Sequence, residues 1–434
     1  MSDKLQRYLY IFLIALVVAS TTGCVWPAMR HVRQGEVYRK NGNFDAAVKE
    51  YTAAIMYDSN YAPAYHKRGI VYLHNDEYQK AIADLTKTLS IDQEQASYYE
   101  SRGQAYYGIG DYAAAISDFS KAIGLNPTNA DNYYRRGIAY DKKGDFESAA
   151  TDYNKFISLQ PDDTKAYSKL GRIYQDRGDY DNALLNFNRA IELDPTYAKN
   201  YEHRGQVYLQ KGDPTAAIAD FNKAIELKSD VSSTYYGRGN AYAIIKEYQK
   251  AISDYNKAIK LDAKNAQAYY ARGNAFYRTG DYMRAISDYS TASTLNPDNP
   301  SYYVRRGFVY LALREDNSAI EDFNTYMKLE PNNAGAYYAL GRAYIHQEKW
   351  ERAMTFFTIA IKLDPTHART YMWNGYAYYK LGRNDEAIVS YTKAIELDPA
   401  NAQKVYELRS EAYAASGQWE KQQADINKWL NPEN

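Results

Sequence analysis

The hydrophobic and small residues of this chain recur with a period of 34 residues. When the unit starts at residue 28, apolar or small side chains fill positions 4, 8 and 11, and then positions 17, 20, 21, 24 and 28. Such spacings place side chains on one face of an α-helix, so each unit is predicted to hold two amphipathic helices. Eleven alanines at position 20, from Ala47 through Ala81 to Ala387, keep the interval. Position 8 is glycine in eleven consecutive units: Gly35, Gly69, Gly103, Gly137, Gly171, Gly205, Gly239, Gly273, Gly307, Gly341 and Gly375.

The segment between the two helices of a unit carries turn signals. Many units have a Gly-Asp pair there, such as Gly110-Asp111. Glycine suits the left-handed residue that ends the first helix, and aspartate caps the second. Prolines mark the junction to the next unit at Pro127, Pro161, Pro195, Pro297, Pro331, Pro365 and Pro399. Each unit is therefore predicted to be a helical hairpin that stacks on its neighbours, with the small residues where backbones approach closely.

This pattern resembles the tetratricopeptide repeat. Position 4 is tyrosine in ten units from Tyr65 to Tyr371, and position 11 is Tyr or Phe from Tyr38 to Tyr378. The resemblance implies an all-α fold, a right-handed superhelical α-solenoid of about 12 hairpins. It runs from residue 28 to the C-terminus. Eleven repeats of 34 residues occupy 28–401, and residues 402–434 form a degenerate twelfth repeat or C-terminal cap, in which Ser410 takes the glycine position.

The first thirty residues differ in character from the repeats. A basic start is followed by the apolar run Tyr8 to Ala19, then by small residues and Cys24, the only cysteine. This order is typical of a secretory signal peptide and resembles bacterial lipoproteins, which implies a signal peptide at 1–23, acylation of Cys24 (palmitate) and a lipidated tether at 24–27. The protein would then be exported and lipid-anchored to the bacterial cell envelope, with Val25 favouring the outer membrane if two membranes are present. An uncleaved anchor over 8–29 and a cytosolic protein with an incidental apolar segment remain alternatives.

Composition excludes several functions. The 53 basic and 53 acidic residues balance, so no excess positive charge exists to bind nucleic acid. One cysteine allows neither an internal disulfide nor a cysteine-based zinc site. The six histidines are scattered without metal-ligand spacing, so we expect no metal and no cofactor. No segment outside the repeats is long enough for a catalytic domain, and the chain is predicted not to be an enzyme.

Two positions of the repeat vary together. Position 7 is arginine in seven units, and the same seven have aspartate at position 23. Units with Leu170, Leu340 or Asn374 at position 7 carry Asn186, Phe356 or Ser390 at position 23. We therefore predict structural ion pairs between the two helices of a unit, instead of an arginine row for anions: Arg68–Asp84, Arg102–Asp118, Arg136–Asp152, Arg204–Asp220, Arg238–Asp254, Arg272–Asp288 and Arg306–Asp322.

The resemblance assigns the other face of each first helix to a concave groove that binds extended peptides or partner helices. Three zones of that face differ in chemistry. A basic stripe suited to carboxylates comprises Arg135, Lys165, Lys169 and Arg172. A second zone, an aromatic wall with amide groups, comprises Tyr236, Asn240, Tyr270, Asn274 and Tyr277. The third zone continues that wall toward the C-terminus through Tyr338 and Arg342.

These features favour a non-enzymatic, membrane-tethered scaffold whose groove binds a protein partner in a bacterial envelope complex. The alternative is a carbohydrate-contacting accessory subunit of a polysaccharide export or glycan assembly system, which would use the tyrosine wall to stack on sugars.

Overall fold

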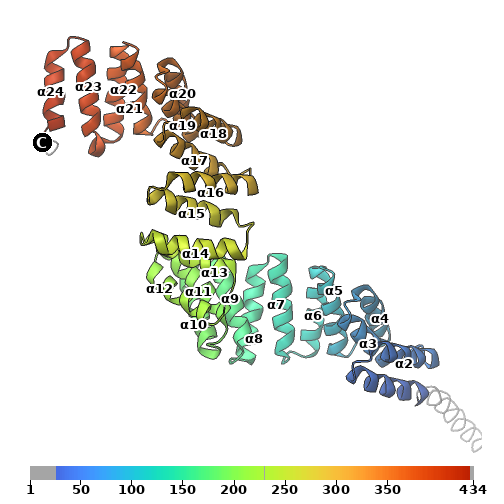
Figure 1. The fold of residues 1–434 in the computed structure, drawn as a ribbon. Helices are drawn as coiled ribbons and strands as arrows, with labels where there is room; N and C mark the ends of the chain where they lie inside the picture. Colours follow the sequence, from blue (N-terminus) through green and yellow to red (C-terminus); the bar gives the residue numbers. More distant parts are fainter. Residues whose placement is uncertain (1–25, 229, 431–434) are drawn as a thin grey trace, which may run out of the picture. The chain divides into compact units, whose positions relative to one another are not determined.

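The structure, a computed structural model, describes residues 26–228 and 230–430. The chain forms two compact units, residues 1–207 and 208–434, and each is described separately. The described residues contain helices and no strand, which confirms the all-α prediction (Figure 1). The predicted signal peptide, residues 1–23, and the predicted acylation site, Cys24, lie outside the described part of the chain.

The first described helix of the first unit covers residues 26–40, so the last two residues of the predicted tether are helical. Its other helices are α2 (Phe44–Tyr57), α3 (Ala62–His74), α4 (Tyr78–Ile91), α5 (Ala96–Gly108), α6 (Tyr112–Leu125), α7 (Ala130–Lys143), α8 (Phe146–Leu159), α9 (Thr164–Asp176) and α10 (Tyr180–Leu193). Helix α11 (Ala198–Gln210) runs from the first unit into the second.

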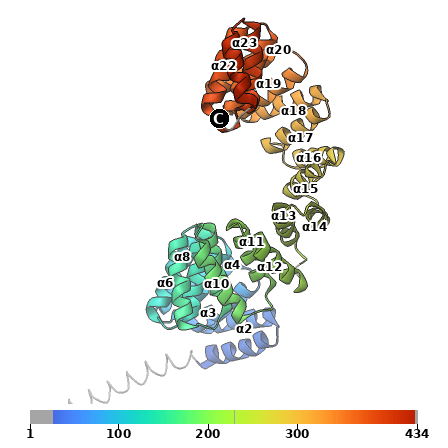
Figure 2. The same cartoon turned by 90° about the vertical axis from the view of Figure 1, so that its left-hand side faces the viewer.

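The second unit continues the same alternation of a first and a second helix in each hairpin. It holds α12 (Pro214–Glu226), α13 (Ser232–Ile244), α14 (Tyr248–Leu261), α15 (Ala266–Arg278), α16 (Tyr282–Leu295), α17 (Pro300–Ala312), α18 (Asp316–Leu329), α19 (Ala334–His346), α20 (Trp350–Leu363), α21 (Ala368–Lys380), α22 (Asn384–Leu397), the 3-10 turn η1 (Pro399–Asn401), α23 (Gln403–Ala415) and α24 (Trp419–Leu430). Figure 2 shows α22 beside α23, with which it packs.

First helices begin where the period places them, at intervals of 34 residues from Ala62 to Ala368. The next first helix begins at Gln403, one residue late, because η1 lengthens the junction. The turn chemistry is also as predicted. Gly110 and Gly144 have positive φ, and the carboxylates of Asp111 and Asp145 accept from backbone N–H groups of the helices they cap.

Most glycines of position 8 lie against an aromatic ring instead of marking a close approach of two backbones, which corrects the sequence-based expectation; Gly69 lies against Leu85. A Cβ on Gly171 would lie 2.8 Å from Cε1 of Phe187, and one on Gly341 would lie 2.5 Å from Cε1 of Phe357. The ring at position 24 therefore lies directly on the glycine of the same hairpin. Both rings are fully buried, so the missing side chain makes room for the largest core residue of the repeat.

The first helices of neighbouring hairpins lie closer together than the second helices. Helix α3 contacts α5 in the first unit, and α17 contacts α19 in the second. Second helices of neighbouring hairpins show no comparable contact among the described residues. Each stack therefore curves toward its first helices, which line the inner face of each unit.

Candidate functional site: the inner face and the interhelical ion pairs

The amide-bearing part of the aromatic wall forms one cavity in the second unit. Tyr236, Asn240, Tyr270 and Asn274 line a cavity of about 490 Å³ on α13 and α15, together with Arg278. Tyr277 does not line this cavity. The structure therefore brings together four of the five residues predicted for this part of the wall.

Two asparagines of this cavity are held by buried tyrosine hydroxyls. The Tyr255 hydroxyl donates to Oδ1 of Asn240 at 2.8 Å, and the Tyr289 hydroxyl donates to Oδ1 of Asn274 at 2.8 Å. Both rings are buried. Since each amide oxygen already accepts a hydrogen bond from a tyrosine hydroxyl, each asparagine side chain keeps its two N–H donors for a ligand in the cavity.

Sequence reasoning missed these tyrosine–amide pairs, although the sequence carries a signal for them. The residues are fifteen positions apart in each hairpin, as are Tyr51 and Glu36, whose side chains also hydrogen-bond at 2.8 Å. Where the earlier position is Ile138, the hydroxyl of buried Tyr153 has no hydrogen-bond partner among the described residues. A tyrosine that follows a glutamate or an asparagine by fifteen residues therefore marks the hairpins in which a polar group is oriented on the inner face.

The tyrosines of the wall are packed against other aromatic rings. The Tyr270 ring lies 5.7 Å from that of Tyr289 and 5.1 Å from that of Tyr302, centroid to centroid, and both contacts are tilted. The Tyr236 ring lies 6.0 Å from that of Tyr255. Such contacts fix the ring orientations, so the two tyrosines form rigid walls of the cavity.

The remaining wall residues lie farther along the second unit. Tyr277 and Arg342 line a second cavity of about 280 Å³ with Arg305 and His346. Nη1 of Arg342 donates to the hydroxyl of Tyr338 at 3.2 Å. The guanidinium of Arg342 also lies 4.2 Å from the ring centroid of Trp373. These residues give that end of the inner face a positive charge.

The predicted basic stripe of the first unit is divided. Arg135 lines a cavity of about 600 Å³ with Tyr107 and Lys142, whereas Lys165, Lys169 and Arg172 do not line it. Nη2 of Arg172 lies 2.8 Å from Oδ2 of Asp141, a carboxylate that sequence reasoning overlooked.

Lysines of the stripe differ in environment. Burial lowers the pKa of Lys169, with a further contribution from nearby Arg172. Lys165 is exposed, with Nζ 3.8 Å from Oδ2 of Asp163. The positive charge of this zone is therefore weaker than the sequence suggests.

Six of the seven predicted interhelical ion pairs are present in the described residues. Their closest nitrogen–oxygen distances are 2.6 to 2.7 Å. The pairs are Arg68–Asp84, Arg102–Asp118, Arg136–Asp152, Arg238–Asp254, Arg272–Asp288 and Arg306–Asp322. Arg204 and Asp220 belong to the same 34-residue repeat but fall on either side of the boundary between the two compact units, and their pairing stays a prediction.

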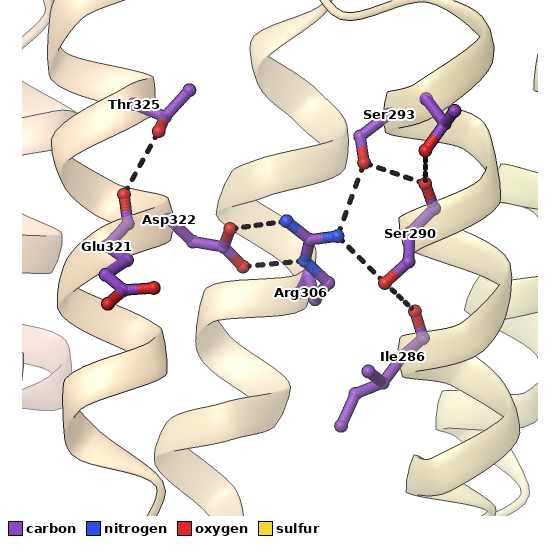
Figure 3. A network of polar contacts seen from close by, with 8 residues as sticks. Ile286, Ser290, Ser293, Arg306, Glu321, Asp322 and Thr325 are labelled. Carbon is purple, nitrogen blue, oxygen red and sulfur yellow. Dashed lines mark hydrogen bonds and ion pairs between the residues drawn. The ribbon is translucent and has the colours of Figure 1, made fainter.

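Each arginine also reaches back to the preceding hairpin. Figure 3 shows Arg306 with Nε and Nη2 on the two carboxylate oxygens of Asp322. Its Nη1 donates to the hydroxyl of Ser290 at 2.8 Å and to that of Ser293 at 3.3 Å. Burial raises the pKa of Asp322, and the hydrogen bonds from Arg306 counteract that rise. One side chain thus links three helices, which supports a structural function for the row.

The described residues hold neither a metal-binding cluster nor a membrane-spanning helix. Within 26–228 and 230–430, no group of three or more His, Cys, Asp or Glu side chains is arranged to hold a metal ion. No helix of those residues combines the length and the apolar character needed to cross a bilayer.

Comparison with known families gives repeated matches along the chain. The family described as TPR repeat matches residues 35–76, 171–212, 205–244, 239–280, 273–313 and 375–417. The family described as tetratricopeptide repeat matches residues 67–130 and 100–164. Residues 313–394 match the family of anaphase-promoting complex, cyclosome, subunit 3. No curated protein matches the chain.

Several solved structures resemble parts of the chain. MamA is 33% identical over 38% of this chain and 96% of its own, with a TM-score of 0.37. YrrB, described as a TPR protein with an unusual peptide-binding site, is 25% identical over 42% of this chain and 95% of its own, with a TM-score of 0.39. Yeast Tom70 is 20% identical over 90% of this chain and 96% of its own, with a TM-score of 0.39.

Proposed function

Because the chain belongs to the tetratricopeptide-repeat family, we propose that it is a membrane-tethered, non-enzymatic scaffold that binds an extended segment of a partner protein. The binding surface is the inner face of the second unit, around Asn240 and Asn274. The observation that carries this proposal is the pair of amides held by Tyr255 and Tyr289. Repeated donors on adjacent hairpins suit the carbonyl oxygens of an extended backbone.

The neighbouring arginines complement these amides. Arg305 and Arg342 line a cavity of the same unit, and neither forms an ion pair with another described residue. A carboxylate of the partner would supply the missing charge. We therefore favour a segment that carries an acidic residue beside the stretch bound at Asn240 and Asn274.

A crosslinking experiment in living cells tests the proposal. A photoreactive amino acid replaces Tyr277, which is 37% exposed, and the captured species are identified by mass spectrometry. We expect a polypeptide, and we expect Asn240→Leu with Asn274→Leu to abolish its capture. Asn324→Leu, a substitution on α18 away from the inner-face cavities, serves as the matched control.

Two results would contradict the proposal. One is capture of the same polypeptide by the double variant with undiminished yield. The other is capture of a glycan, which would support the carbohydrate-contacting alternative. The packing of Tyr270 between two other tyrosines argues for the protein partner, because that ring is already engaged.

The tether is tested separately. Acylation of Cys24 predicts a mature chain that starts at this residue, with an intact mass that includes the attached lipid. Cys24→Ser is expected to release the protein from the bacterial membrane fraction. An unmodified chain that starts at Met1 would remove the lipid anchor and the envelope location from the proposal, and leave the groove untouched.

A further inference from the structure

The interhelical arginine of the repeat occupies a site built by two adjacent hairpins. Arg238 is a clear example. Its guanidinium binds both carboxylate oxygens of Asp254 and donates to Oδ1 of Asn222, sixteen residues earlier. It lies 5.8 Å from the ring centroid of Tyr235 and 5.9 Å from that of Tyr242. The chain thus contains a recurrent binding site for one guanidinium, made of acceptors and two tyrosines.

The hairpin of α21 and α22 keeps this site but lacks the arginine. Asn374 and Ser390 stand where the other hairpins have arginine and aspartate. Both line a cavity of about 730 Å³, together with Thr358, the acceptor position of the preceding hairpin. Tyr371 and Tyr378, the equivalents of the two tyrosines around Arg238, line it too.

Two other hairpins without the arginine are filled by leucine. Leu340 is fully buried in a core cluster against which Phe356 packs, and Leu170 is buried in another. Asn374 is too short to replace an arginine, which explains why this hairpin is hollow. Its side chain is nevertheless buried, since the residue is only 5% exposed.

Asn374 has a buried acceptor without a donor. Its Oδ1 has no hydrogen-bond partner among the described residues, and leaving a buried acceptor unsatisfied has a free-energy cost. An N–H donor that enters the cavity would remove this cost. The cavity therefore favours a ligand with donors at its tip.

The walls and the rim define the rest of the ligand. Ile361, Ile388 and Val389 provide apolar walls, and Val389 is 69% exposed at the opening.

Three carboxylates, Asp385, Glu386 and Glu396, and a single lysine, Lys393, surround the cavity. Glu386 and Glu396 are paired with Arg383 and Lys393, whereas Asp385 forms no ion pair with another described residue. A cationic tip on an apolar stem matches this arrangement.

We propose that this cavity binds an arginine side chain supplied by a partner protein, in place of the intramolecular arginine of the other hairpins. The site shares no residue with the inner-face cavity at Asn240 and Asn274. It is therefore a second attachment point for a protein partner, and it does not depend on the proposed groove.

The test uses the full chain labelled with ¹⁵N-asparagine and follows the side-chain amide signal of Asn374 by NMR. The signal is assigned as the one absent from Asn374→Ser. The probe is Nα-acetyl-arginine methylamide, with the lysine and citrulline analogues as comparisons. We expect a saturable shift with the arginine probe, and binding about tenfold weaker for both analogues because each lacks the charged fork.

Two variants block the site in different ways. Val389→Lys adds a positive charge at the exposed opening and is expected to abolish saturation. Asn374→Arg with Ser390→Asp restores the ion pair of the other hairpins, raises the Tm and closes the cavity, so in this variant we expect no probe binding detectable by calorimetry. Asn240→Leu with Asn274→Leu is expected to leave the Asn374 shift unchanged.

Absence of a saturable Asn374 shift in the unmodified chain would overturn the proposal. So would an equal shift with Val389→Lys, or equal binding of the three probes. Loss of the shift in the Asn240 and Asn274 double variant would show that the probe acts through the inner face and not through this cavity.

Discussion

The guanidinium of Arg409 donates to both carboxylate oxygens of Asp425, sixteen residues later, at 2.7 and 2.8 Å. This pair was not predicted, because the one-residue shift of the last hairpin hides it from the 34-residue register. The third donor of Arg409, Nη1, binds the hydroxyl of Thr392 in the preceding hairpin at 2.8 Å. Asp425 is the buried residue of α24, so the pair fastens the last helix to the stack.

Removal of one partner of an interhelical ion pair should destabilise the protein, whereas replacement of both partners by apolar residues should not. We expect Asp322→Ala to lower the free energy of unfolding of the second unit by about 3 kcal/mol, because Arg306 stays buried without its acceptor. The side chain of Arg306 is only 16% exposed. Chemical denaturation, monitored through hydrogen exchange in α17 and α18, measures the loss of unfolding free energy.

A double variant distinguishes the effect of leaving one charge unpaired from the effect of removing the whole ion pair. Arg306→Leu with Asp322→Phe copies the natural combination Leu340 and Phe356, and we expect its stability to lie within about 1 kcal/mol of the parent. If the Asp322→Ala variant were as stable as the parent, water would be hydrating the Arg306 guanidinium in place of Asp322. The ion pair would then contribute nothing to stability.

The glycines of position 8 should resist even the smallest enlargement. We expect Gly171→Ala to destabilise the first unit by about 1–2 kcal/mol, because its Cβ would lie within 2.8 to 2.9 Å of three carbons of the Phe187 ring. This net loss remains because the steric cost at the Phe187 ring exceeds the gain in helix propensity, which is about 1 kcal/mol.

Gly124 provides the matched control in the same unit. It lies in the last turn of α6, and a Cβ there would meet no atom within 4 Å. We expect Gly124→Ala to stabilise the unit, as measured by the urea midpoint. A stable Gly171→Ala variant would show that the ring can move aside.

Stability of the first unit should fall with acidity through His66. Burial, and then the charge of Lys67, lower the pKa of His66 from 6.5 to about 4. The unfolded chain therefore binds the proton more tightly than the folded one, so protonation favours unfolding as the pH falls from 6.5 to 4. The loss amounts to ~3 kcal/mol below pH 4.

The matched variant is His66→Gln, which keeps a group able to hydrogen-bond to Ser101, whose hydroxyl lies 3.0 Å from Nε2 of His66. Hydrogen exchange of α3 and α5 at pH 4 and pH 7 should show a smaller pH dependence in this variant than in the parent. Equal dependence would mean that other groups carry the effect.

The tyrosine hydroxyls should be positioning groups for the inner-face amides. We expect Tyr255→Phe with Tyr289→Phe to weaken partner capture, because the amides of Asn240 and Asn274 can then turn. The loss per hydrogen bond is about 1 kcal/mol. Tyr153→Phe is the control: its buried hydroxyl has no partner among the described residues, so the substitution should leave stability equal or higher.

A distinct readout separates positioning from folding. In the double Tyr→Phe variant, the side-chain ¹⁵N signals of the two asparagines should broaden or shift while helix content stays constant by circular dichroism. Unchanged asparagine signals together with weaker capture would contradict the positioning function.

The sequence by itself determined the hairpin, its register and most of the ion pairs. A strict period fixes which residues meet inside a hairpin, since positions 8 and 24, as in Gly171 and Phe187, and positions 7 and 23, as in Arg306 and Asp322, are sixteen residues apart in every repeat. Covariation at a constant spacing therefore reported local contacts directly.

Only the tertiary structure decided what lies between hairpins and which polar groups remain unsatisfied. Arg172 is neutralised by Asp141, thirty-one residues earlier, and the hollow at Asn374 needs the wall that Thr358 and Ile361 provide. These outcomes depend on side-chain volumes and distances across two or three helices. A periodic pattern records the type of each residue, but it contains no information about the space that the neighbouring hairpins leave unfilled.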